Sequence, residues 1–65
     1  MTRTEAIAEM QKGNKVTHLF FSDNEWMTMG NGKIITEEGY KHSPYEFWSY
    51  RQLESWKDGY SLYVA

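Results

Sequence analysis

The residues of this chain that are best suited to chemistry lie in one segment, Ser43 to Trp56, which reads SPYEFWSYRQLESW. It interleaves aromatic side chains with a single arginine. Aromatic rings stack on flat ligands, and they also pack well in protein interfaces. The segment therefore predicts a stacking site that uses Tyr45 or Trp48, while a hydrophobic core or a partner surface would explain the same composition.

The arginine of this segment, Arg51, directly follows Ser49 and Tyr50. Its planar guanidinium is suited to hold a phosphate group or to stack over a ring. We expect Arg51 to contact the phosphate of a ligand. The alternative is a surface ion pair with Glu46 or Glu54.

Residue types that carry catalysis are sparse. The sequence contains no cysteine, no glycine-rich phosphate loop and no His-Glu-x-x-His pattern. His18 falls in a predicted strand and is expected to be structural, and His42 beside Lys41 is expected in a solvated loop. Asp23 and Glu25 are expected to be turn and strand-end groups, because a buried carboxylate with a perturbed pKa is hard to build in a short chain. We therefore expect that the protein is not an enzyme and uses no metal or cofactor.

The length of 65 residues predicts a single domain, 1–65, close to the lower limit for independent folding. Chains of this size usually need disulfides, a metal or a second subunit. The absence of cysteine removes disulfides and suits the reducing cytoplasm. Unless dense core packing suffices, association through an aromatic surface is the remaining supplement, so we expect a homo-oligomer.

The charge pattern limits the partners. The net charge is −2, with acidic and basic residues in short alternation and no basic run. Direct binding to nucleic acid is therefore not expected. The N-terminus has no apolar core of signal-peptide length, and no stretch is long enough to span a bilayer. We expect a cytoplasmic protein that does not bind membranes.

The local signals predict an α+β fold. Thr2 or Thr4 opens a helix, since Thr2 to Glu5 fits a capping box, and Gly13 or Asn14 ends it. A helix of about three turns is marginal alone and must pack on another element. That element is an antiparallel sheet of three or four strands, which the composition predicts over residues 15–21, 25–29, 33–36 and 60–64.

Turn signals connect these elements. Asn31-Gly32 between two alternating strands is the strongest short signal for a β-hairpin. Ser43-Pro44-Tyr45-Glu46 fits a second capping box, with proline at the first helical position. A short helical turn is therefore predicted near residues 43–50.

The aromatic side chains exceed the space that such a core offers. One sheet face under a short helix holds roughly six to eight large side chains. Apolar residues already expected there are Ile7, Met10, Val16, Leu19, Phe20 or Phe21, Ile34, Ile35 and Leu62. Several aromatic residues must then lie at the surface, in a subunit interface or in a pocket. At helical spacing, Tyr45 and Trp48 share one side of the second helix, and Phe47, Tyr50 and Arg51 share another.

The N-terminal half carries a resemblance to a known family. Glu5 to Val16 reads Glu-Ala-Ile-x-x-Met-x-x-Gly-x-Lys-Val, and it leads into a strand, a Trp-containing strand, a Gly-turn hairpin and a closing strand. This order resembles the small phage and prophage proteins of the Thoeris anti-defense family, whose members sequester a cyclic ADP-ribose-type signal. The resemblance implies a homo-oligomer with nucleotide pockets between subunits and no catalysis.

The family pattern is not complete in this chain. Members of the family usually carry Arg-x-x-Trp soon after the Lys-Val pair, whereas Thr17 to Phe20 stands here and the tryptophan comes at Trp26. Trp26 is the position that we carry over as a ligand-binding residue. The resemblance also fits other phage inhibitors of bacterial defence, including anti-CRISPR proteins, which bind a protein.

Together these features predict a non-enzymatic phage or prophage protein that acts in the bacterial host cell. The first hypothesis is capture of a nucleotide-derived signalling molecule, by stacking on Trp26, Tyr45 or Trp48 and phosphate contact from Arg51. The second is a protein-interaction inhibitor that blocks a host defence protein through an aromatic surface. A structural or assembly role without a ligand is the third.

Overall fold

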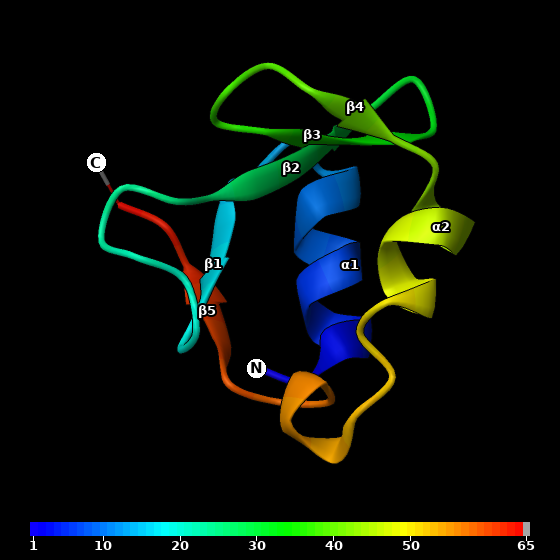
Figure 1. The fold of residues 1–65 in the computed structure, drawn as a ribbon. Helices are drawn as coiled ribbons and strands as arrows, with labels where there is room; N and C mark the ends of the chain where they lie inside the picture. Colours follow the sequence, from blue (N-terminus) through cyan, green and yellow to red (C-terminus); the bar gives the residue numbers. More distant parts are fainter. Residues whose placement is uncertain (65) are drawn as a thin grey trace.

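The computed structural model describes residues 1–64, which form the predicted α+β fold (Figure 1). Its elements follow in the order α1 (Arg3–Gln11), β1 (Val16–His18), β2 (Met27–Gly30), β3 (Lys33–Thr36), β4 (Lys41–His42), α2 (Pro44–Ser49), the 3₁₀-helix η1 (Glu54–Trp56) and β5 (Tyr60–Leu62). Among the described residues, no helix has the length and apolar character needed to cross a membrane.

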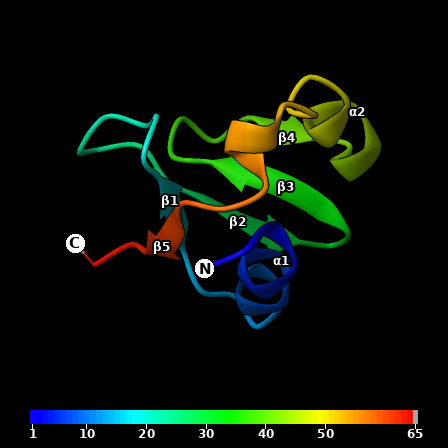
Figure 2. The ribbon, with the colours of Figure 1, turned by 90° about the horizontal axis from the view of Figure 1, so that it is seen from below.

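All five strands form one antiparallel sheet in the order β4-β3-β2-β1-β5. The sheet has five strands, where three or four were predicted, because the short strand β4 pairs with β3 directly before α2. This pairing places His42, which was expected in a loop, opposite Ile34. Both helices lie on the same face of the sheet: α1 contacts β1, β2 and β5, and α2 contacts β3 (Figures 1 and 2).

Helix α1 begins with the predicted capping box. Thr2 Oγ1 accepts a hydrogen bond from the Glu5 N–H at 3.2 Å, and the Glu5 carboxylate accepts one from the Thr2 N–H at 2.9 Å. The two residues thus satisfy amides that a helix N-terminus leaves without partners. The helix ends before Gly13, whose φ of +90° is a left-handed conformation that glycine adopts without strain.

The predicted Asn31-Gly32 hairpin also forms. Asn31 and Gly32 have φ angles of 53° and 75°, and the type I′ turn requires positive values at both positions. The turn sets the register of β2 and β3, in which Met27 lies opposite Thr36. Because Met27 is buried under the helices, Thr36 faces the same side of the sheet.

Strand β1 ends at His18, three residues earlier than predicted, because the following amides have other partners. The Phe20 N–H donates to His18 Nδ1 at 3.0 Å, and the Phe21 N–H donates to the His18 carbonyl at 2.9 Å. The chain therefore turns instead of continuing in the sheet. Phe20 is exposed as a result, while Phe21 packs at the edge of the core.

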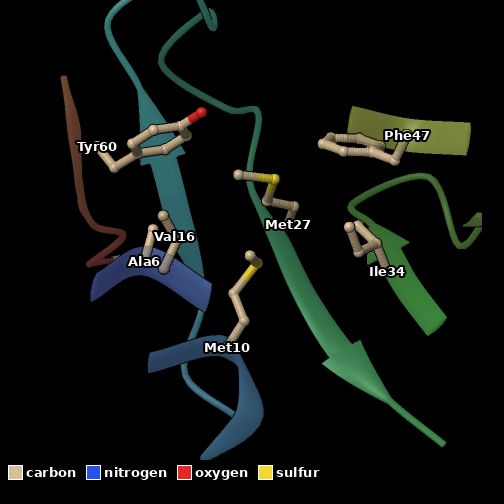
Figure 3. Close-up of a cluster of buried hydrophobic side chains, with 7 residues drawn as sticks. All are labelled: Ala6, Met10, Val16, Met27, Ile34, Phe47 and Tyr60. Atoms are coloured by element: carbon tan, nitrogen blue, oxygen red, sulfur yellow. The ribbon is translucent and has the colours of Figure 1, made fainter. Parts of the chain in front are cut away.

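The core differs in part from the predicted set. Its buried side chains are Ala6, Met10, Val16, Met27, Ile34, Phe47 and Tyr60 (Figure 3). Leu19 and Leu62, which were expected inside, are 81% and 49% exposed. Phe47 and Tyr60 occupy this space, because α2 and β5 bring them over the sheet from distant parts of the chain. Figure 3 shows Met27 between the two rings.

The N-terminus of α2 differs from the prediction. Ser43 makes no side-chain hydrogen bond to the helix, so the second capping box is wrong. Strand β4 ends one residue before Ser43, and its pairing with β3 fixes the direction in which the chain enters the helix. Pro44 then supplies a helical φ at the first position.

Two hydrogen-bonded glutamates predict that stability falls in acid. The Thr2 backbone N–H lowers the pKa of Glu5, and the Ser22 backbone N–H lowers the pKa of Glu25, from an ordinary value of 4.5. A carboxyl group whose pKa is lower in the folded chain stabilises it above the unfolded pKa. This contribution is lost as the pH falls through the folded pKa. We expect the melting temperature to decrease between about pH 5 and pH 3.

Melting curves of Glu5→Gln and Glu25→Gln test this dependence. Each substitution keeps an acceptor oxygen but removes the titration, so each should flatten the pH profile. Glu38→Gln, at an exposed side chain, is the matched control and should leave the profile unchanged. Identical profiles for all three variants would contradict the assignment.

Candidate ligand-binding site

A hollow of about 490 Å³ lies beside α2, and we call it the α2 hollow. Its volume is within the range of small-molecule sites, about 300–1,000 Å³. The lining residues come from α1, α2 and the segment after α2: Arg3, Pro44, Tyr45, Trp48, Ser49 and Gln52. This set contains one positive charge, two aromatic rings and no acidic side chain.

Two of the predicted site residues, Tyr45 and Trp48, meet in the α2 hollow. They lie one helical turn apart, so the predicted sharing of one helix side is confirmed. Trp48 is half-buried, and its ring meets Phe47 edge-on, with centroids 5.0 Å apart. Tyr45 is 85% exposed. The hollow therefore has one aromatic wall held by packing and one that extends into solvent.

Arg3 supplies the positive charge of the α2 hollow, and the sequence analysis missed it. Its guanidinium carbon lies 4.9 Å from the centroid of the Trp48 ring. Its Nη2 donates to the Arg51 carbonyl at 2.6 Å and to the Trp56 carbonyl at 3.4 Å. A signal was present in the sequence, because a cation is unfavourable in the first turn of a helix and needs another reason to be there.

Arg51 lies on the other side of α2, together with Phe47, and does not line the α2 hollow. Its guanidinium carbon is 3.9 Å from the Phe47 ring centroid and 5.3 Å from that of Trp56. Stacking over a ring, one of the two expected uses of this arginine, is thus confirmed. The alternative ion pair with Glu46 or Glu54 is wrong, since Arg51 forms no ion pair within residues 1–64.

Burial shifts the pKa values of two groups near α2, those of Arg51 and Tyr60. It lowers the pKa of the Arg51 guanidinium, because its positive form is partly removed from water. Burial also raises the pKa of the Tyr60 hydroxyl, and the nearby Arg3 and Arg51 partly offset that rise. The Tyr60 hydroxyl donates to the Trp56 carbonyl at 2.5 Å. Two arginines without acidic partners therefore lie on either side of α2, near one buried tyrosine.

Two smaller hollows, of about 140 and 220 Å³, border Arg51. They share four lining residues: Thr36, His42, Phe47 and Arg51. Glutamates line them as well, with Glu25, Glu37 and Glu38 in the first and Glu46 in the second. Like charges repel, so these carboxylates oppose an anion. A phosphate group is better accommodated in the α2 hollow than beside Arg51.

Trp26 lies apart from Tyr45 and Trp48 and shares a hollow only with Arg51 among the predicted site residues. It borders the smaller of these two hollows, but its ring lies against Lys15, at 4.3 Å from Nζ to the centroid, and Tyr63, at 6.3 Å between centroids. The Trp26 ring therefore packs against side chains that do not line the α2 hollow.

His18, expected to be structural, has both ring nitrogens engaged within the fold. Nδ1 accepts from the Phe20 N–H, and Nε2 lies 2.8 Å from the Asp58 carbonyl. The ring is 4% exposed and stacks on Trp56. The structural expectation is therefore confirmed. In the described part of the chain, no group of three His, Asp or Glu side chains is close enough to hold a metal ion.

The fold and the α2 hollow define a small α+β protein with an aromatic, positively charged hollow of ligand size. Comparison of the chain with protein-family models, with curated proteins and with solved structures found no match. Its function is therefore proposed from the geometry of the hollow and from the sequence resemblance.

Proposed function

We propose that this chain is a non-enzymatic phage or prophage protein that counters bacterial defence by sequestering a nucleotide-derived signalling molecule. One observation carries the proposal: two of the residues expected to stack on a ligand, Tyr45 and Trp48, line one ligand-sized hollow with Arg3. A nucleotide presents a flat base to such rings and a phosphate to such a cation.

The composition of the hollow favours this ligand class over others. Its lining has a cation but no carboxylate, so it attracts an anion and disfavours a free amine. Ser49 and Gln52 add polar groups that can bind a base edge or a sugar hydroxyl.

The proposed site includes a second copy of the chain, which covers part of the α2 hollow. Tyr45 is 85% exposed at the hollow, and a partner subunit would cover it. The resemblance to the Thoeris anti-defense family implies such inter-subunit pockets. We therefore propose a homo-oligomer, in the cytoplasm of the bacterial host, that encloses the ligand between subunits.

Thermal melting with a panel of cyclic nucleotides and ADP-ribose derivatives tests the proposal. A ligand that binds only the folded chain adds about 2.7 kcal/mol at a concentration one hundred times its Kd. In a chain of this size we expect the melting temperature to rise by roughly 10 °C or more. Tyr45→Ala and Trp48→Ala should each abolish most of this rise.

Tyr50→Ala is the matched control. Tyr50 is 84% exposed, almost the same as Tyr45, but it lies on the side of α2 away from the α2 hollow. It should leave the ligand-induced rise intact. If no member of the panel stabilises the protein, the proposal is wrong, and a purely monomeric state in solution would contradict the inter-subunit pocket.

A second candidate function rests on the exposed apolar side chains. These are Leu19, Phe20, Tyr40, Tyr45, Tyr50, Leu53, Leu62 and Val64. Leu19 and Phe20 are consecutive and 81% and 60% exposed, which favours an interface. A protein-interaction inhibitor of a host defence factor would use such a surface. No response to the nucleotide panel, together with a stable complex with one purified defence protein, would favour this function.

A further inference from the structure

We infer that the Arg3 Nε–H and the Trp48 indole N–H form a pair of donors for one oxyanion of the ligand in the α2 hollow. The inference rests on the proposed function only in that it concerns the same hollow. It assigns phosphate recognition to Arg3 in place of Arg51. It also gives Trp48 a hydrogen-bonding role besides stacking.

Both donors lack a partner in the described chain. Arg3 Nε and Trp48 Nε1 are buried and have no hydrogen-bond acceptor. Buried donors are nearly always paired, so an unpaired one needs an explanation. Two other buried groups without a partner, Thr36 Oγ1 and Arg51 Nε, line the smaller hollows, where glutamates oppose an anion. Arg3 and Trp48 are in contact and line the α2 hollow, which has no acidic side chain. A shared acceptor from outside the chain explains both at once.

The positive charge of Arg3 indicates which chemical group accepts from the two donors. Arg3 forms no ion pair within residues 1–64, and the hollow has no carboxylate. A neutral carbonyl oxygen can accept from both donors but leaves the guanidinium charge uncompensated. An oxyanion satisfies the charge and accepts from both groups, and hydrogen bonds between charged partners are the stronger ones. We therefore assign a phosphate or carboxylate oxygen to this position.

Two backbone carbonyls hold the Arg3 guanidinium in a defined position. Its Nη2 is held by the carbonyls of Arg51 and Trp56, so the far end of the guanidinium is fixed on the segment after α2. Both donors are covered in the empty hollow, so an entering oxyanion has to part the guanidinium from the indole ring. The environment of the Trp48 indole should therefore change on binding.

Nuclear magnetic resonance of the full chain tests the inference directly. The indole N–H signal of Trp48 should shift on titration with pyrophosphate and with acetate at high concentration, and stay in place with sodium chloride at the same ionic strength. A shift with pyrophosphate alone identifies phosphate as the anion, and a shift with both identifies any oxyanion. The signals of Trp26 and Trp56 serve as internal references in the same spectrum.

Two variants measure the contribution of each donor separately. Trp48→Phe keeps an aromatic ring but removes the indole N–H, and should weaken phosphate-bearing ligands about tenfold. Arg3→Lys keeps the charge but removes Nε, and should weaken them to a similar degree. Trp26→Phe removes the same N–H group from a ring that does not line this hollow and should leave affinity unchanged. If Arg3→Lys does not fold, the affinity of Trp48→Phe and the shift of the Trp48 indole signal still test the inference.

The outcomes separate this inference from the proposed function. If nucleotides bind and Trp48→Phe binds them as tightly as the parent chain, the donor pair is wrong and the function stands. If pyrophosphate shifts the Trp48 indole signal but no nucleotide stabilises the protein, the donor pair stands and the function is wrong. An indole signal that no phosphate compound moves overturns the inference.

Discussion

Replacement of His18 with alanine is expected to lower the free energy of unfolding by about 3 kcal/mol or more. The imidazole is 4% exposed, and its centroid lies 4.3 Å from that of Trp56 in a stacked arrangement. Its loss leaves a cavity and two unpaired backbone groups, the Phe20 N–H and the Asp58 carbonyl. A chain of this length has a total stability of only about 3–10 kcal/mol.

The direction of the two hydrogen bonds predicts a graded series of substitutions. Because Nδ1 accepts from the Phe20 N–H, the ring proton lies on Nε2 and donates to Asp58. His18→Asn keeps an acceptor near Nδ1, and His18→Gln keeps a donor near Nε2. Each should be less destabilising than alanine. His18→Phe preserves the ring volume but leaves both backbone groups unpaired, so it should still cost about 2 kcal/mol or more.

Urea unfolding followed by circular dichroism measures this series. His42→Ala is the matched control, since this histidine is exposed on the short strand β4, and it should change stability by less than about 0.5 kcal/mol. Equal stabilities for the two alanine variants would show that the buried hydrogen bonds of His18 contribute nothing.

His18 also shows why part of the fold was not predictable from local pattern. The run from Lys15 to Phe21 is β-branched and aromatic, and its composition favours a longer strand. The strand stops because the His18 side chain accepts from the Phe20 N–H, and the Asp58 carbonyl and the Trp56 ring hold the imidazole in that position. That contact spans some forty positions of sequence, so no local window contains it.

The features that were predicted correctly have causes within a few residues. The Thr2–Glu5 capping box and the Asn31-Gly32 turn are set by neighbouring side chains and by backbone conformation. The separation of Tyr45 and Trp48 from Phe47 follows from helical geometry alone. Helical spacing alone therefore predicts that Tyr45 and Trp48 lie on the same side of α2.

The features that were not predicted depend on tertiary contacts. Arg3 reaches Trp48 only because α1 lies close to the end of η1, where the Trp56 carbonyl accepts from it. Arg51 packs over Phe47 because α2 ends there, and not because a glutamate attracts it. The α2 hollow is therefore lined by Arg3 and not by Arg51, and of the three aromatic residues predicted to bind a ligand, Tyr45 and Trp48 line it whereas Trp26 does not.

Phe47→Ala is expected to remove about 3–5 kcal/mol of stability and to abolish ligand binding at the α2 hollow. Helix α2 has only six residues and lacks a side-chain cap, so it is marginal by itself. Phe47 is its one buried residue and contacts Trp48 edge-on, His42 at 5.9 Å and the Arg51 guanidinium at 3.9 Å. Its removal should detach α2 from the sheet.

Loss of α2 would separate the walls of the hollow, because Tyr45 and Trp48 are on this helix and Arg3 is on α1. Hydrogen exchange should show faster exchange at residues 44–51 than in β2 and β3, at temperatures where the sheet is still folded. Phe47→Leu should lose less stability and retain binding, and Tyr50→Ala should change stability by less than about 0.5 kcal/mol. If Phe47→Ala melts like Tyr50→Ala, the docking of α2 does not depend on this ring, and another contact must hold the hollow together.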